Sequence, residues 1–250
     1  MVRLLRYEIV SCFELDETVI FSCGPILKRM QQNFGGNLIP ISTPENAPPP
    51  LPRIVLQSKA FILKLALDRV SITVTPPAHV TDNIEKSSKY ASQRVASVYK
   101  ELFSVILNYE WTGIVAHLEF PNNLSECRSA VEAATPIFDK LINIDRHGKE
   151  LSTFQFQFGF REDNLYVNYT IGGYENRSIK VDNVEKGKFK KIDIKDHPID
   201  ECGIQLMLDI NNRLGSKTKK PIEDVDLLFS KQINCTETIS IDTNLEDILS

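Results

Sequence analysis

The stretch from residue 153 to residue 173, TFQFQFGFREDNLYVNYTIGG, most narrows the folds that this chain can adopt. Phenylalanine occupies every second position from 154 to 160, and after a short polar break four more apolar residues repeat the alternation. Successive side chains of a β-strand point to opposite faces, so the pattern predicts a hairpin in which both strands carry one apolar face. Four exposed phenylalanines would each cost about 1.5–3 kcal/mol, so we expect this face to be buried beneath helices. Gly172-Gly173 predicts a turn at the end of the hairpin.

An aromatic row can also serve as a platform on which nucleic-acid bases stack. Such platforms interleave rings with arginine and lysine, so that bases and phosphates are bound together. Here the intervening residues are Gln155, Gln157 and Gly159, and the first positive charge is Arg161. The formal net charge of −4 supplies no general attraction to phosphate. The pattern therefore favours a packed core over base stacking, and nucleic acid is not the favoured partner.

The remaining segments alternate between strand-like and helix-like patterns. One helix is predicted with Pro25 in its first turn and Gly35-Gly36 at its end, and a long one over residues 81–107 with Asp82 and Glu85 as a capping box. Further elements are strands near residues 4–15, 37–42, 111–120, 174–181, 188–195 and 203–210, a meander over 53–77, a second long helix over 123–143, and a helix starting at Pro221. This order predicts the α+β class, with largely antiparallel sheet packed against two or three long helices.

The positions of the prolines suggest how the chain is divided into parts. Residues 43–52 contain five prolines, which remove donors and fix φ, so we expect an extended connector rather than a helix or a central strand. A surface loop and a docking site for a polyproline-binding module both fit this segment. We expect an N-terminal α+β part over residues 1–78 and a helix-packed sheet part over residues 79–250. A single continuous domain is the alternative.

The sequence carries few signatures of common active or metal sites. It contains no GxSxG, HExxH, CxxC, GxGxxG or GxxxxGK[ST] motif, and its five cysteines are scattered. We expect most cysteines to be buried and unpaired, and His117 to be a packing residue inside a strand. No cofactor is predicted from these patterns, and the favoured hypothesis is a protein that is not an enzyme.

One segment, VDNVEKGKFKKIDIK, resembles the PD-(D/E)xK pattern of metal-dependent nucleases. Asp182 precedes a turn, and Asp193 and Lys195 follow in a strand-like context. The resemblance implies that the two carboxylates hold Mg²⁺ while the lysine orients or activates the attacking water. The proline that precedes the first acid in that pattern is missing here. The alternative function is therefore a metal-dependent nuclease or a nucleic-acid-binding protein.

The same segment is rich in lysine. Its side chains form either a solvated loop or a patch that contacts phosphates, and such a patch would give binding a steep salt dependence. The candidate phosphate-binding residues are Lys186, Lys188, Lys190 and Lys191.

The order of landmarks in the second half resembles an uncharacterised, sporadically distributed family of prokaryotic proteins of about 250 residues. The shared features are a helix before a strand near the middle, the strand LMLDI at residues 206–210, and a terminal helix with LLF at residues 227–229. The resemblance implies no assigned activity. It implies a prokaryotic assembly linked to mobile elements or antiviral defence.

The favoured hypothesis is a non-catalytic subunit that binds another protein or itself. No apolar run approaches the roughly 20 residues that cross a membrane, so we expect no membrane association. Acidic residues interrupt the N-terminal segment where a signal peptide would need an apolar core, so we expect a cytoplasmic protein. These residues are Glu8, Glu14, Asp16 and Glu17.

Overall fold

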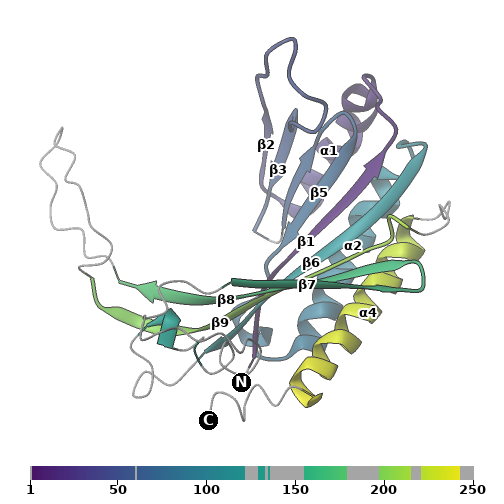
Figure 1. The fold of residues 1–250 in the computed structure, drawn as a ribbon. Coiled ribbons are helices and arrows are strands. Elements are labelled where there is room, and N and C mark those ends of the chain that lie inside the picture. Colours follow the sequence, from purple (N-terminus) through teal and green to yellow (C-terminus); the bar gives the residue numbers. More distant parts are fainter. Residues whose placement is uncertain are drawn as a thin grey trace, which may run out of the picture.

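A twisted antiparallel sheet of nine strands runs through the part of the chain that the structure describes (Figure 1). The structure is a computed structural model. It describes residues 2–59, 61–121, 129–132, 135, 155–178, 197–214 and 221–242, with the side chains of the last helix described to residue 236. The strand order is β2-β3-β4-β5-β1-β6-β9-β8-β7, and each neighbouring pair is antiparallel. The predicted α+β class with a large antiparallel sheet is confirmed.

The elements have the following bounds. The strands are β1 (Arg3–Phe13), β2 (Asn37–Pro40), β3 (Ile54–Gln57), β4 (Phe61–Leu65), β5 (Arg69–Val74), β6 (Tyr109–Pro121), β7 (Gln155–Glu162), β8 (Leu165–Arg177) and β9 (Ile199–Asn211). The longer described helices are α1 (Val19–Phe34), α2 (Ile84–Leu102) and α4 (Pro221–Asp242), and η1 (Ala78–Val80) is a 3-10 turn. Residues 130–132 are also helical. None of the described helices combines the length and apolar character that crossing a membrane requires.

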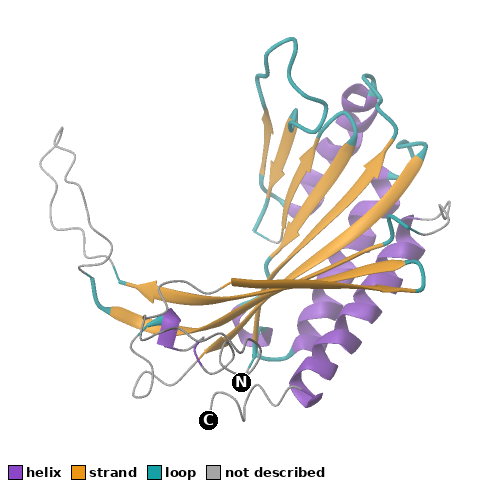
Figure 2. Ribbon diagram, in the orientation of Figure 1, coloured by secondary structure: helices purple, strands orange, loops and turns teal. Residues whose placement is uncertain are grey.

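The three longer helices lie on one side of the sheet (Figure 2). The strands direct apolar side chains toward the helices at every second position, as in Leu206, Leu208 and Ile210 of β9. These side chains are almost completely buried, whereas the residues between them are half-buried. In α2, buried residues such as Ala91 and Val95 recur at helical spacing. One core therefore extends across the sheet beneath the helices, and the opposite side of the sheet, here called the open face, carries the alternate residues.

Two clusters of buried or half-buried hydroxyl groups join the helices to the central strands. The Tyr7 hydroxyl of β1 donates to Gln232 Oε1 of α4 at 2.7 Å, and Ser88 Oγ of α2 donates to the same oxygen at 3.2 Å. In the second cluster, the Tyr109 hydroxyl of β6 donates to Asp224 Oδ2 of α4 at 2.7 Å. Since buried polar groups without partners are costly, these contacts fix how α2 and α4 sit on the sheet.

Several predicted boundaries differ from the structure. Helix α1 begins at Val19 and contains Pro25 in its interior, because buried residues at helical spacing extend through the proline. Asn83 rather than Asp82 caps α2, and its Oδ1 accepts a hydrogen bond from the Lys86 N–H at 2.8 Å. Gly172 and Gly173 form no turn but lie inside β8, which also contains the first four residues of the strand predicted at 174–181.

Two segments that precede β3 are fixed by close backbone contacts. Gly36 has φ of +105°, and a Cβ there would lie 2.2 Å from the carbonyl oxygen of Gln57, so only glycine allows β2 to approach β3. The predicted connector is a loop between β2 and β3, as expected. The Arg53 guanidinium donates to the carbonyl oxygen of Ala47 at 3.0 Å and to that of Leu51 at 3.2 Å, which holds the loop over the start of β3.

The two halves of the chain repeat one topology. In the first half, β1 is followed by α1, the meander β3-β4-β5 and α2. In the second half, β6 is followed by the helical residues 130–132, the meander β7-β8-β9 and α4. Strand β5 returns beside β1 as β9 returns beside β6, and β1 pairs with β6 at the centre. The duplication relates β1 to β6, β5 to β9, β4 to β8 and β3 to β7. Within the described residues, β2 has no counterpart.

Candidate functional site

The residues predicted to hold a metal ion or phosphate lie outside the described part of the chain. Asp182, Asp193 and Lys195 stay predictions, as do the lysines at 186, 188, 190 and 191. The structure describes the strands on both sides of this segment, where Arg177 of β8 pairs with Ile199 of β9. Among the described residues, no group of three or more histidine, cysteine or acidic side chains is arranged to hold a metal ion.

Two of the described cysteines, Cys12 and Cys23, are poor nucleophiles. Cys12, Cys23 and Cys235 are buried free thiols, as predicted. Burial raises the pKa of the Cys12 thiol to about 11 and that of the Cys23 thiol to about 12, so both stay protonated at neutral pH. Cys202 is also buried and is disulfide-bonded, which was not predicted.

The alternating phenylalanines of β7 are less buried than the sequence predicted. Phe154 lies outside the described residues, Phe156 and Phe158 are half-buried, and Phe160 is 58% exposed. The prediction of a row wholly hidden beneath helices is wrong at Phe160. The reason is the position of β7, which forms the last strand of the sheet, whereas α4 packs over β6 and β9. At this edge α4 reaches β7 through an ion pair between Lys231 and Glu162.

The exposed edge carries a cluster of contacting rings. The ring of Phe158 stacks on that of Tyr169 of β8, with centroids 4.9 Å apart and planes 15° apart. Phe156 and Phe160 lie on either side of Phe158, at centroid distances of 5.4 Å and 5.6 Å. We call Phe156, Phe158, Phe160 and Tyr169 the aromatic row. It lies on the same side of the sheet as the helices and continues their apolar layer to β7, the last described strand of the sheet.

On the open face, the strand registers align side chains in rows that cross five strands. The first row runs from β7 to β1 through Gln155, Gly172, Gln205, Glu119 and Arg3. The second row runs through Gln157, Thr170, Met207, His117 and Arg6. The β7 end of both rows is therefore uncharged, and the β1 end is ionic.

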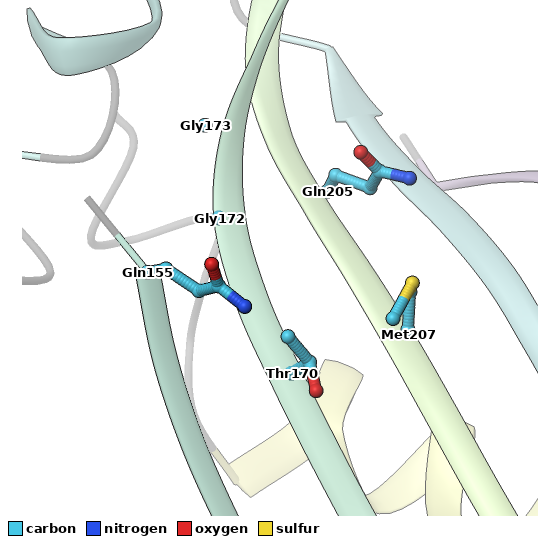
Figure 3. A pocket seen from close by; sticks show the side chains of 6 residues that line it. All are labelled: Gln155, Thr170, Gly172, Gly173, Gln205 and Met207. Atoms are coloured by element: carbon cyan, nitrogen blue, oxygen red, sulfur yellow. The ribbon is translucent and has the colours of Figure 1, made fainter. Parts of the chain in front are cut away.

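A shallow pocket of about 240 Å³ lies at the uncharged end (Figure 3). The carboxamides of Gln155 and Gln205 stand on either side of Gly172, which has no side chain to fill the space between them. Thr170 and Met207 line the next row, and Gly173 completes the lining. Carboxamides both donate and accept hydrogen bonds, so the pocket suits a neutral polar group such as a main-chain or side-chain amide.

The ionic end of the first row is a closed cluster around Arg3. Its Nη2 donates to Glu119 Oε2 at 2.9 Å, to Glu201 Oε1, and to the Tyr174 hydroxyl at 3.4 Å. Burial raises the pKa of Glu119, although Arg3 acts in the opposite direction. Burial also acts to raise the pKa of Glu201, but hydrogen bonds from Arg3 and Tyr174 outweigh it and hold that pKa below its usual value. Both carboxylates are thus engaged in fixing four strands.

His117 occupies the second row and packs against charged neighbours. Its Nε2 lies 3.3 Å from Glu8 Oε1, and Arg6 Nε lies 2.9 Å from the same carboxylate oxygen. Burial, together with the charge of Arg6, lowers the pKa of His117, so the imidazole is neutral at neutral pH. The predicted packing role is consistent with this buried position.

No protein-family model matches the chain, and no curated protein sequence matches it significantly. The resemblance to a sporadically distributed prokaryotic family therefore stays a hypothesis. The open face was not predicted, although its signal is present in the alternation of His117 and Glu119 with the apolar residues of β6. The strand predicted at residues 203–210 forms as part of β9, and its residues Gln205 and Met207 are half-buried on the open face.

Proposed function

We propose that the protein is a non-catalytic, self-associating subunit of a larger prokaryotic assembly, and that it binds through the β7 side of its sheet. The observation that carries the proposal is the aromatic row on the last strand. Phe160 is 58% exposed at the sheet edge, where the fold places no described helix over it. Burial of a phenylalanine favours association by about 1.5–3 kcal/mol, and aromatic side chains are enriched in protein interfaces.

The charges around this surface favour a protein over a nucleic acid as the partner. The basic side chains at the β1 end pair with neighbouring carboxylates, as Arg3 does with Glu119 at 2.9 Å and Arg6 does with Glu8 at 2.9 Å. Lys231 beside the aromatic row pairs with Glu162. Binding to a phosphate backbone draws its affinity from unpaired cations that displace counterions. Arg161 is the one cation that β7 itself carries, and a single cation beside a neutral pocket suits a polypeptide surface better than a phosphate backbone.

We also propose the biological setting that the sequence resemblance implies. A subunit encoded in a mobile or defence-associated neighbourhood would act with products of adjacent genes, and self-association would present several copies of its open face to them. We also propose that the protein lies in the cytoplasm, the compartment that the sequence predicts.

The test is the mass of the purified full chain in solution, measured by light scattering after size exclusion over a wide range of concentration. We expect a mass that is a multiple of the 28.4 kDa chain. Phe160→Ser should lower that mass, whereas Phe21→Ser should not, although Phe21 on α1 is 83% exposed. A monomer at every concentration would contradict the proposal.

A further inference from the structure

The outer edge of β7 has hydrogen-bonding groups directed away from the sheet. The N–H of Asn212 donates to the carbonyl oxygen of Thr112 at 3.1 Å, so these two residues form a hydrogen-bonded pair between β6 and the end of β9. Hydrogen-bonded and non-hydrogen-bonded pairs alternate along antiparallel strands. The registers from β6 through β9 and β8 therefore determine which backbone groups of β7 bond to β8. Phe158 is thereby bonded to Tyr169. The odd-numbered residues 155, 157, 159 and 161 direct their N–H and C=O groups outward.

The hairpin between β7 and β8 gives the same phase independently. Glu162 pairs with Leu165 across the two-residue turn Asp163-Asn164, and Asp163 has φ of +52°. The pair that closes a two-residue hairpin is hydrogen-bonded, so Glu162 and every second residue before it face β8. The two registers therefore place the same backbone groups on the outer edge of β7, where no described residue pairs with them. Unpaired strand edges of this kind are templates for another strand.

The duplicated topology shows that this position accepts a strand. In the first half, β3 occupies the place that β7 has in the second half, and β2 pairs with its outer edge in antiparallel register from Asn37 opposite Gln57 to Pro40 opposite Ile54. Among the described residues, the second half has no strand beyond β7. The edge of β7 is also longer than that of β3, with eight residues instead of four.

We propose that β7 pairs antiparallel with β7 of a second copy of the chain, about a two-fold axis at Phe158, so that two nine-stranded sheets become one continuous sheet. This inference rests on the proposed function and names its surface. A two-fold axis gives each copy the same contacts, which is the commonest way in which soluble proteins form dimers.

The side chains of β7 are complementary to themselves in this register. On the helix side, Phe158 lies opposite its own mate and Phe156 lies opposite Phe160, so the two aromatic rows merge. On the open face, Gln155 lies opposite Arg161, and the residues at 157 and 159 face each other. No like charges meet, and aromatic pairs across strands are stabilising. A shift of the axis to residue 159 would instead set a phenylalanine against the carboxylate of Glu162.

The first test removes one outward donor without touching the bonds to β8. Proline has no N–H and is tolerated on edge strands where that group faces solvent. We expect Gln157→Pro to weaken dimerisation by about tenfold or more, whereas Gln157→Thr, which keeps the N–H, should dimerise like the wild type. Thermal unfolding of both variants checks that the fold is retained. Equal dimerisation of a folded Gln157→Pro variant would overturn the inference.

The second test reports the register itself and uses single cysteine variants of the full chain. At the axis the two Cα atoms of residue 158 form a non-hydrogen-bonded pair about 4.5 Å apart, within the range that a disulfide spans. Phe158→Cys should therefore give a covalent dimer on oxidation with copper phenanthroline. Phe160→Cys is the matched control, because residue 160 is more exposed but lies roughly 14 Å from its mate.

The outcomes separate this inference from the proposed function. Cross-linking at position 158 but not at 160 supports the β7 pair. A chain that self-associates but cross-links at neither position, or only at 160, overturns the pair and leaves the proposed function intact. A wild-type chain that is monomeric throughout overturns both.

Discussion

Replacing Arg3 by methionine removes the guanidinium at the ionic end of the open face and keeps most of the aliphatic stem. Arg3 Nη2 binds the carboxylates of Glu119 and Glu201, which come from β6 and β9. A hydrogen bond to a charged group contributes about 1.5–3 kcal/mol. The side chains of Arg3 and Glu201 are 30% and 26% exposed, so water replaces part of what is lost. We therefore expect the free energy of unfolding to fall by about 2–3 kcal/mol at neutral pH.

The effect of Arg3→Met should depend on pH in a defined direction. In the wild type the pKa of Glu201 is depressed, so its stabilising contribution is present above the unfolded pKa of about 4.3 and is lost as pH falls through the folded value. The pKa of Glu119 is raised by burial, so its contribution is present at low pH and is lost as pH rises. Without Arg3, both pKa values rise. Folding of the variant is then accompanied by proton uptake. The loss in its free energy of unfolding, relative to the wild type, should therefore shrink as the pH is lowered toward 5.

The assay is urea unfolding of wild type and variant at neutral pH and near pH 5, with the difference calculated from midpoints and slopes. Lys64→Met is the matched control, because Lys64 is an exposed cation on β4 and should change stability by less than about 0.5 kcal/mol. A loss as small as that of the control, or a loss that does not vary with pH, would refute the role assigned to the Arg3 cluster.

Three further predictions concern other parts of the chain. Gly36→Ala should destabilise the protein by about 2–3 kcal/mol in urea unfolding, because its Cβ would meet the Gln57 carbonyl oxygen; Gly35→Ala, with nothing within 4 Å, should cost less. Gln232→Ala should cost about 2–4 kcal/mol, because it leaves two buried hydroxyl groups with one acceptor fewer, and unchanged stability would refute the role of that cluster. DNA and RNA incubated with the protein in Mg²⁺ or Mn²⁺ should stay intact on gels; cleavage that Asp193→Ala abolishes would favour the nuclease alternative.

Local sequence patterns predicted many of the helices and strands, but not which elements pack or pair beside them. The alternation in β6 and the helical spacing in α2 reflect interactions between residues close in sequence, and both elements form where expected. The Phe158 pattern predicts an apolar strand face equally well for a central strand and for an edge strand, because the difference depends on which distant segments pair beside it. The same limit explains Gly172, since two adjacent glycines favour a turn locally but here lie within a strand paired on both sides.

The pocket and the Arg3 cluster could not be predicted from the sequence, because both depend on the registers between strands. Gln155 and Gln205 are fifty positions apart in the sequence, and they face each other because β8 lies between their strands and places Gly172 between them. Arg3 and Glu201 meet for the same kind of reason, across β6. No local signal fixes such alignments, because moving one strand by a single residue would turn its side chains to the other face.

The duplicated topology and Tyr7 together constrain how the protein unfolds. Each half completes its own meander, so either could begin to form while the other is still extended. Yet the Tyr7 hydroxyl of the first half is bonded to Gln232 in the last helix of the second. Detachment of α4 from the sheet therefore exposes β1, at the other end of the chain. The two repeats should unfold in one cooperative transition and not as separate units.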